Sequence, residues 1–336
     1  MAASIEAVKL ICKTTCKEEE ILMSRQRPIV LLEKKFPELL PHNIAPGINR
    51  LGIMLPYTPL HHLLFHEELQ YLIMTSGNIS GMPICYKDDE AFEKLKGIAD
   101  FFLVHDREIL TPIDDSVVRV IDEKEMVIRS ARGYSPSDIQ IDSDSEILAA
   151  GAEQKSSICL LHKGYVHSAQ YMGSLDEMIA YEEYLKLIKR MKVLLGAEPQ
   201  IIAHDLHTGY LSTQWAIKQP AERIPIQHHH AHMAACMAEH DLKQDAIGII
   251  YDGTGMGTDG AIWGGEFLIG SKGKFLRVGH WKYVTLQGGD SAIKEPWKSA
   301  ASYLYAMGIN GEELINSVHS LKVKALQKAI KYNVNC

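Results

Sequence analysis

A run of histidines fills the segment Gln227-His-His-His-Ala-His232. His228 and His232 stand four residues apart, so on a helix both imidazoles project from one face and can together hold one metal ion. The two histidines that follow His228 would point elsewhere. A metal also needs a further ligand, usually a carboxylate, and Asp252 is a candidate for it. The alternative interpretation is a polar helix start with an adventitious histidine cluster.

A glycine-rich motif, Asp252-Gly-Thr-Gly-Met-Gly-Thr-Asp-Gly260, directly follows the apolar run 247–251. Its glycines let backbone N–H groups turn toward a phosphate, and its threonines offer hydroxyls. The candidate nucleotide contacts are Gly253, Thr254, Gly255 and Gly257. Because an apolar strand precedes the motif, we expect a phosphate-binding loop; a glycine-rich hairpin without a ligand is the alternative.

Two more polar turns follow apolar runs. The segment Thr75–Pro83 has the hydroxyl, amide and glycine content of a loop that holds a phosphate after a strand. Its candidate contacts are Ser76, Asn78 and Ser80, and a surface turn is the alternative. Lys155 lies in the corresponding turn of a later strand pair, where a lone lysine is usually only solvated.

The composition limits the environment and the partners. The chain has 336 residues, of which 46% are hydrophobic and 23% charged, as in folded proteins, and its formal net charge is −7. This charge, without any run rich in Lys or Arg, does not attract a nucleic acid. No apolar stretch approaches the roughly 18 to 20 residues that span a bilayer, and the cysteines lack paired Cys-x-x-Cys spacing. We therefore expect a cytoplasmic protein that binds neither nucleic acid nor membrane.

The first 140 residues alternate helical and extended patterns. A helix is expected over 5–22. Short apolar runs predict strands at 28–32, 72–75, 101–104 and 116–121. Strands that alternate with helices are typical of an α/β sheet.

The composition becomes acidic and rich in serine between residues 137 and 146. A domain boundary is expected there, so that the domains cover 1–138 and 147–336 and residues 139–146 form a linker.

The α/β pattern restarts after this boundary. The predicted strands are 147–150, 157–161, 165–169, 201–203 and 247–251. Lys163-Gly164 should form a tight hairpin turn between the second and third of them. A helix should begin at a capping box made by Ser174 and Glu177 and end at Gly196.

Many motifs, in order, resemble the HypF family of carbamoyltransferases. Those that resemble the later part of its YrdC-like domain are Pro56-Tyr-Thr-Pro-Leu-His-His62, Thr75-Ser-Gly-Asn-Ile-Ser-Gly81, Asp114-Asp-Ser-Val-Val-Arg119 and Ala131-Arg-Gly-Tyr134. Those that resemble the start of its Kae1-like domain are His204-Asp-Leu-His207, the histidine run, the glycine-rich motif, Trp263-Gly-Gly-Glu-Phe267, Gly288-Gly-Asp290 and Glu295-Pro-Trp297. The resemblance implies an α/β fold, with a partial YrdC-like twisted-sheet domain followed by a partial nucleotide-binding domain of the actin/Hsp70 (ribonuclease H-like) class.

The resemblance also implies an enzyme, a carbamoyltransferase of nickel-iron hydrogenase maturation. In that family an acylphosphatase domain cleaves carbamoyl phosphate, and the YrdC-like domain adenylates the carbamate with ATP. The Kae1-like domain then passes the carbamoyl group to the C-terminal cysteine of the partner HypE, for synthesis of the cyanide ligands. The implied cofactors are ATP with Mg and a divalent metal, Zn or Fe.

The resemblance assigns roles to residues of this chain. Ser76, Asn78 and Ser80 would contact ATP phosphates, and the segment Gly253–Gly257 would face a second nucleotide. His228 and His232 would hold the metal, with Asp252 close by or ligating. No catalytic residue is assigned.

Parts of the family pattern are not in this sequence. They are the acylphosphatase module, the zinc-finger cysteines, the early basic motif of the YrdC-like domain and the second half of the Kae1-like domain. We therefore expect a chain that is truncated at both ends. One alternative is a non-catalytic docking module that binds nucleotide or metal. Another is a transferase of the tRNA threonylcarbamoyl type, which the form of the histidine motif does not support.

Overall fold

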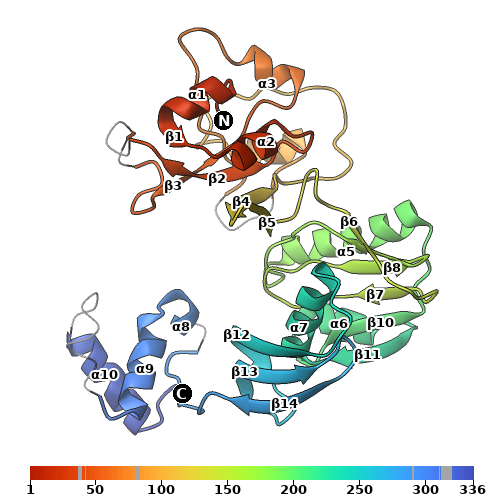
Figure 1. Ribbon diagram of the computed structural model, residues 1–336, viewed down its shortest axis with the longest axis vertical. Coiled ribbons are helices and arrows are strands. Elements are labelled where there is room, and N and C mark those ends of the chain that lie inside the picture. The colour runs from red at the N-terminus through yellow and green to blue at the C-terminus, as the bar shows by residue number, and fades with distance from the viewer. Residues whose placement is uncertain (37–39, 42, 80–83, 290, 310, 312–319) are drawn as a thin grey trace. The chain divides into compact units, whose positions relative to one another are not determined.

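Figure 1 shows the computed structural model of the chain, which describes every residue except 37–39, 42, 80–83, 290, 310 and 312–319. The described residues form two compact units, Met1–Ile226 and Gln227–Cys336. Both contain strands and helices, so the expected α/β class is confirmed. In the part of the chain so described, no helix is both long and apolar enough to cross a membrane.

The described N-terminal part of the first unit contains a five-stranded sheet. Its strands are β1 (Cys12–Lys13), β2 (Ile29–Lys34), β3 (Arg50–Ile53), β4 (Val117–Ile121) and β5 (Lys124–Arg129). Their order is β1-β2-β4-β5, with β3 paired to β2. Strands β2 and β4 run parallel, and the other pairs are antiparallel. The side chains of Val30, Leu32 and Val118 are fully buried in the core of this sheet.

Two helices, not one, precede β2. Helices α1 (Ile5–Ile11) and α2 (Cys16–Met23) are separated by β1, so the prediction of one helix over 5–22 is wrong. A capping box starts α2: the Thr15 hydroxyl accepts a hydrogen bond from the N–H of Glu18, and the Glu18 carboxylate accepts one from the N–H of Thr15. This local arrangement satisfies the first free N–H groups and favours a new helix start.

Two of the four strands expected in this region are found. Strands β2 and β4 correspond to the runs 28–32 and 116–121. The runs 72–75 and 101–104 form no strand, and Phe101 is 93% exposed. A run of four apolar residues carries no information on whether a neighbouring strand is free to pair with it. Among the described residues of this region, the remaining helices are the short α3 (Pro59–Leu63) and α4 (Asp88–Lys94).

The described C-terminal part of the first unit contains a six-stranded sheet. Its strands are β6 (Ser137–Gln140), β7 (Ile147–Ala149), β8 (Cys159–His162), β9 (Tyr165–Ser168), β10 (Ile201–Asp205) and β11 (Glu222–Ile226), in the order β11-β10-β7-β8-β9-β6. Strands β7, β10 and β11 are parallel. The predicted hairpin turn is confirmed, with positive φ at Lys163 (49°) and Gly164 (78°). The linker expected over 139–146 overlaps β6, which pairs with β9; the domain limits themselves stay a prediction.

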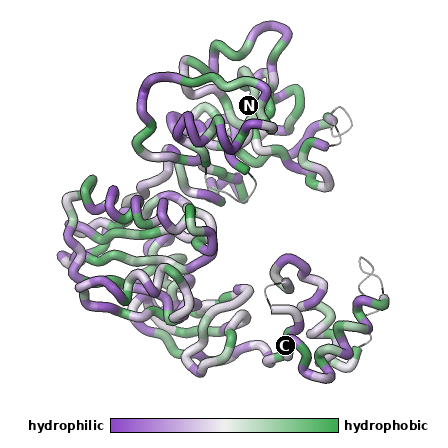
Figure 2. The backbone as a smooth tube through the Cα atoms, turned by 180° about the vertical axis from the view of Figure 1, so that it is seen from behind, coloured by the Kyte–Doolittle hydropathy of each residue, from purple (hydrophilic) through white to green (hydrophobic). Residues whose placement is uncertain are grey.

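Helix α5 (Met178–Leu195) packs on this sheet. Its buried side chains Tyr184, Leu187 and Ile188 form one cluster with Leu148 and Leu160 of the strands, and burial of each large apolar side chain contributes about 1.5–3 kcal/mol. Purple and green both occur along α5 in Figure 2, because an amphipathic helix carries polar residues on one face and apolar residues on the other.

The ends of α5 agree only in part with the expectation. The helix ends at Gly196 in the left-handed conformation, as predicted. It begins after Glu177, whose side chain makes no capping hydrogen bond, so the predicted capping box with Ser174 is wrong. The next helix, α6 (Leu211–Ile217), follows β10.

The second unit places helix α7 (His228–Glu239) on a three-stranded antiparallel sheet of β12 (Ala246–Met256), β13 (Ile262–Gly270) and β14 (Phe275–His280). Met233 and Met237 of α7 form a buried cluster with Ile250, Trp263 and Leu268 of the sheet. Helices α8 (Ser291–Lys294), α9 (Trp297–Ala306) and α10 (Ser320–Lys331) follow.

Strand β12 differs from the prediction. It was expected over 247–251, but it spans Ala246–Met256. Ile247, Ile249 and Tyr251 are exposed, because the described helix α7 packs on only one face of the sheet.

Candidate functional site

The histidine run begins helix α7, and this positions two of its imidazoles. The Gln227 side chain caps the helix by accepting a hydrogen bond from the N–H of His230 at 2.8 Å. His228 and His232 are then one turn apart on the same face, with their Nε2 atoms 3.2 Å from each other. The helix and the spacing expected from the sequence therefore bring the two rings together.

Asp252 of β12 completes a group of three possible metal ligands. Its Oδ2 lies 3.1 Å from Nε2 of His228, and the ligand atoms of His228, His232 and Asp252 all lie within 4.8 Å of one another. In a tetrahedral site with bonds of about 2.0–2.1 Å, two ligand atoms lie about 3.3 Å apart. These two imidazoles and one carboxylate therefore fit a divalent ion such as Zn or Fe. His232 is exposed, which leaves one side of the group open to solvent.

Charge at this site favours cation binding. Burial of the Asp252 carboxyl raises its pKa, but hydrogen bonds from His228 and from the N–H of Gly253, at 2.7 Å, lower it more. The net result is a pKa below the ordinary value for an aspartic acid. The carboxylate is therefore ionised at neutral pH, as a metal ligand must be.

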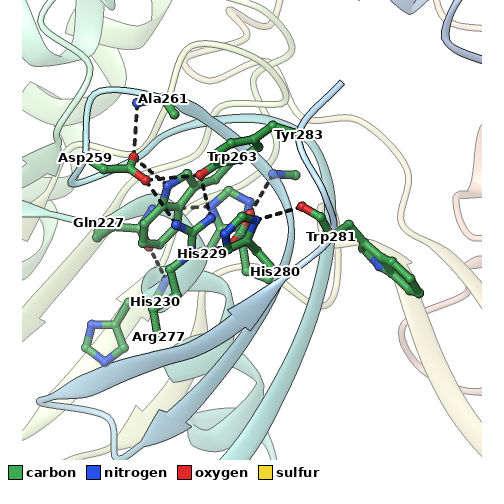
Figure 3. A network of polar contacts seen from close by, with 12 residues as sticks. Gln227, His229, His230, Asp259, Ala261, Trp263, Arg277, His280, Trp281 and Tyr283 are labelled. Atoms are coloured by element: carbon green, nitrogen blue, oxygen red, sulfur yellow. Dashed lines mark hydrogen bonds and ion pairs between the residues drawn. The ribbon is translucent and has the colours of Figure 1, made fainter. Parts of the chain in front are cut away.

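The two other histidines of the run point away from the metal group, as predicted. His229 is fully buried, and its ring lies 5.8 Å from that of Trp263. Burial lowers the pKa of His229, so that its imidazole is neutral at pH 7. Nε2 of His230 lies 3.0 Å from the carbonyl oxygen of Ser271. Figure 3 shows both rings among their neighbours.

The glycine-rich motif is not a loop that follows a strand. Residues 252–254 form a bulge within β12, since Tyr251 pairs with Gly265 and the next paired residue, Gly255, is opposite Trp263. The turn comes later, at 257–261. The residues predicted to contact a nucleotide separate into two pairs: Gly253 and Thr254 are exposed, whereas Gly255 and Gly257 are buried. Their contact with a nucleotide stays a prediction.

The other predicted nucleotide contacts lie in the first unit. The Ser76 hydroxyl donates to Oδ1 of Asn78 at 2.5 Å, and the Asn78 amide donates to the Ile79 carbonyl at 3.0 Å, so this segment forms a small polar turn. Ser80 lies outside the described residues. Lys155 is exposed and has a positive φ of 49°, which is uncommon for a residue with a Cβ.

A polar network that sequence reasoning did not predict lies under the turn 257–261 (Figure 3). Arg277 of β14 stacks on the ring of Trp263, 4.0 Å from its centroid, and its Nε donates to Glu266 at 2.6 Å. Its two other nitrogens donate to Asp259, at 3.0 Å, and to the Tyr283 hydroxyl, at 2.7 Å. The motif Trp263–Phe267 was a signal for part of this network, but nothing in the sequence pointed to Arg277.

Asp259 and Tyr283 are the exposed members of this network among the residues just named. Partial desolvation raises the pKa of the Asp259 carboxyl. Hydrogen bonds from the N–H of Ala261, the indole of Trp263 and the hydroxyl of Tyr283 have the larger, opposite effect, and the resulting pKa is about 2. The carboxylate is therefore ionised at neutral pH, where it accepts these hydrogen bonds at the turn.

Comparison with known families covers most of the chain. Residues 1–131 match the family described as Telomere recombination, and residues 142–239 match the HypF Kae1-like domain. Residues 248–336 match the family described as Carbamoyltransferase, Kae1-like Domain, second subdomain.

Individual relatives show the same similarity. Carbamoyltransferase HypF2 of Cupriavidus necator is 42% identical over 88% of this chain and 40% of that protein. Carbamoyltransferase HypF of Synechocystis sp. is 41% identical over 86% of this chain and 38% of that protein. The chain thus spans about 40% of the length of these curated relatives.

Two crystal structures are also similar. Full-length HypF in the phosphate- and nucleotide-bound form has a TM-score of 0.91 and 42% identity, covering 99% of this chain and 44% of that one. HypF of T. kodakarensis has a TM-score of 0.89 and 35% identity, covering 100% of this chain and 46% of that one. The expected YrdC-like and Kae1-like folds are therefore confirmed.

Proposed function

Because this chain belongs to the HypF family of carbamoyltransferases, we propose that it takes part in nickel-iron hydrogenase maturation. Its activity is the ATP-dependent transfer of a carbamoyl group, through carbamoyl-adenylate, to the C-terminal cysteine of HypE. Carbamoyl phosphate is the source of the group, and the reaction takes place in the cytoplasm. The transferred group becomes a cyanide ligand of the hydrogenase.

The observation that carries this proposal for the transfer site is the group of His228, His232 and Asp252. Their ligand atoms lie within 4.8 Å of one another, in a region that matches the Kae1-like families. A divalent Zn or Fe ion, when bound, supplies a Lewis acid that polarises a carbonyl or phosphate oxygen. The imidazoles of His228 and His232 and the carboxylate of Asp252 would hold such an ion, and the exposed side of the group at His232 would leave room for the reacting molecule.

The polar turns of the two units supply the proposed nucleotide contacts. In the YrdC-like part, Ser76, Asn78 and Ser80 bind the phosphates of ATP with Mg. There the carbamate oxygen displaces pyrophosphate from ATP, and carbamoyl-adenylate forms. In the second unit, the exposed hydroxyl of Thr254 at the bulge binds the second nucleotide, and Gly253, which has no side chain, leaves room for a phosphate beside it. In the first unit, Lys155 offers a positive charge to a nucleotide phosphate.

In the transfer step, the thiolate of the HypE cysteine attacks the carbamoyl carbon. The bond from that carbon to the phosphate oxygen of AMP breaks, and AMP leaves. The thiol proton goes to solvent or to a base that we do not assign. The role of this chain is to hold the carbamoyl group in position for the attacking thiolate.

The test is transfer of label from carbamoyl phosphate to HypE. The chain is assayed with ATP and HypE, alone and with the parts of a curated relative that it does not span supplied in trans. Label on the C-terminal cysteine that disappears with His228→Ala supports the proposal. Transfer that persists in His228→Ala/His232→Ala would exclude the metal group from the reaction. A complete set of parts that binds ATP and metal but never labels HypE would indicate a binding role without turnover.

A further inference from the structure

At two glycines of the β12–β13 hairpin, other protein groups occupy the space that a side chain would need. A Cβ added to Gly255 would lie 2.6 Å from Cε1 of His229 and 3.1 Å from Cβ of His228. A Cβ added to Gly264 would lie 2.8 Å from the carbonyl oxygen of Asp252. Real Cβ atoms essentially never come within 3.0 Å of such neighbours. Any other residue at either position would therefore displace these neighbouring groups.

These neighbouring groups lie at the metal site or beside it, since His228 and Asp252 are proposed ligands and His229 follows His228 in α7. Gly255 lies under the start of α7, next to His228, and Gly264 lies opposite the bulge that carries Asp252. A bulge turns a side chain out of its regular direction in a strand. Gly255 thus determines how closely α7 lies to β12, and Gly264 determines how closely the bulge lies to β13. The separation of the imidazoles from the carboxylate depends on both distances.

The buried ring of His229 contributes to the contact between α7 and β12. Its Nδ1 lies 3.3 Å from Nε2 of Gln227, and the same Gln227 amide lies 3.2 Å from the Met256 carbonyl, to which it donates. The start of α7 is therefore tied to the end of β12 through Gln227, while the ring of His229 fills the space over Gly255. Trp263 packs beside this ring and in turn lies over the bare Cα of Gly257.

Close packing is not confined to these two glycines. A Cβ at Gly248 would lie 2.8 Å from Cδ1 of Ile250, and one at Gly265 would lie 2.2 Å from Cδ1 of Trp281. By contrast, a Cβ at Gly253 or at Gly273 would have no heavy atom within 4 Å, and one at Gly279 would lie in ordinary contact, 3.7 Å from Phe267. What distinguishes Gly255 and Gly264 is the identity of their neighbours, which are the side chains at the start of α7 and the backbone of Asp252.

We propose that Gly255 and Gly264 are positioning residues of the metal centre. Gly255 lets α7 lie close enough to β12, and Gly264 lets the backbone of Asp252 lie close enough to β13, for two imidazoles and one carboxylate to share one ion. This inference rests on the metal site of the proposed function.

The size of the displacement indicates the effect to expect. A methyl group at Gly255 must move from 2.6 Å to at least 3.4 Å from the His229 ring before the contact is an ordinary one. A shift of several tenths of an ångström is large compared with the tolerance of about 0.2 Å in metal–ligand distances. Changes in the groups that orient metal ligands typically cost about 10–100-fold in affinity.

The experiment measures Co²⁺ binding by the full 336-residue chain. The variants Gly255→Ala and Gly264→Ala are titrated in competition with a chromophoric chelator, and the visible spectrum of bound Co²⁺ reports its coordination. We expect each variant to bind at least about tenfold more weakly than the wild type. The matched controls Gly273→Ala and Gly279→Ala should bind as the wild type does. Thermal melting of each metal-free variant separates lost affinity from lost folding.

A size exchange tests the mechanism itself. In Gly255→Ala/His229→Ala the ring that the new methyl group meets is removed, so the helix can return toward β12. The double variant should bind Co²⁺ at least about threefold more tightly than Gly255→Ala alone, a favourable coupling between neighbours in contact.

The possible failures are distinguishable. Wild-type affinity in both Gly255→Ala and Gly264→Ala would overturn the inference and leave the metal site standing. Weaker binding by the double variant than by Gly255→Ala would also overturn the inference alone. A wild-type chain that binds no Co²⁺ would overturn the metal site and the inference together.

Discussion

Replacement of Arg277 by methionine should leave a buried charge without its partner. Glu266 is 1% exposed, and its carboxylate accepts from Nε of Arg277 at 2.6 Å and from the N–H of Gly264 at 3.2 Å. Methionine keeps most of the packing against Trp263 but carries no charge and no donor. Breaking a buried ion pair by removal of one partner costs about 3–5 kcal/mol.

The lower end of this range applies to Arg277→Met. The Arg277 side chain is 18% exposed, so water can reach part of the space that the guanidinium leaves. The lost bond to Asp259 adds little, because that carboxylate is 42% exposed and its charge is screened by solvent. We expect a loss of about 3 kcal/mol in the free energy of unfolding. For a unit of roughly a hundred residues this lowers the melting temperature by about 12 °C or more.

The assay is urea denaturation of the full chain, with unfolding monitored by tryptophan fluorescence and by circular dichroism. Lys272→Met, an exposed change in the same unit, serves as control and should stay within about 0.5 kcal/mol of the wild type. Arg277→Met/Glu266→Gln should be more stable than Arg277→Met, because the buried group is then neutral. The reasoning is refuted if Arg277→Met costs no more than the control, or if the double variant is the less stable of the two.

Three further outcomes are expected. The variant His228→Ala/His232→Ala should lose the bound Zn or Fe measured by mass spectrometry after dialysis, whereas His230→Ala, whose ring faces Ser271, should keep it; equal loss in both would indicate non-specific binding. Gly253→Val should weaken ATP binding by at least about tenfold, or about 1.4 kcal/mol, in calorimetric titration, because Gly253 is exposed and a side chain there meets no protein atom; unchanged affinity would make the bulge purely structural. The pKa of Asp259 is lowered from 3.8 to about 2, so its contribution to stability is present above pH 3.8 and is lost as the pH falls through 2. When urea denaturation is measured between pH 5 and 2, the free energy of unfolding should fall less steeply with decreasing pH in Asp259→Asn than in the wild type, and an identical fall would contradict the assignment.

Local patterns were sufficient for several elements of the fold. The helix that starts after Gln227 follows from a run of helix-compatible residues, and its i, i+4 spacing places His228 and His232 on one face. The hairpin at Lys163-Gly164 and the helix end at Gly196 depend on residues that adopt positive φ. In each case the interactions that decide the structure lie within a few residues of one another in the sequence.

Short apolar runs were a weaker guide. The runs 28–32 and 72–75 look alike in sequence, yet only the first is part of a strand. The difference is that β2 has β3 and β4 beside it to accept its hydrogen bonds. The availability of a partner strand is a property of the folded unit and not of the run.

The sequence by itself thus determined the α/β class, the family and the pair of histidines, because periodicity and ordered motifs are local properties of the chain. Only the tertiary structure decided that Asp252 stands in a bulge beside that pair, that Arg277 closes the network around Glu266, and that Gly255 is buried under α7. These features join residues from different elements, and the distances between them depend on how closely a helix and two strands pack. Packing of that kind depends on the shapes of all the side chains in contact, which no spacing along the sequence records.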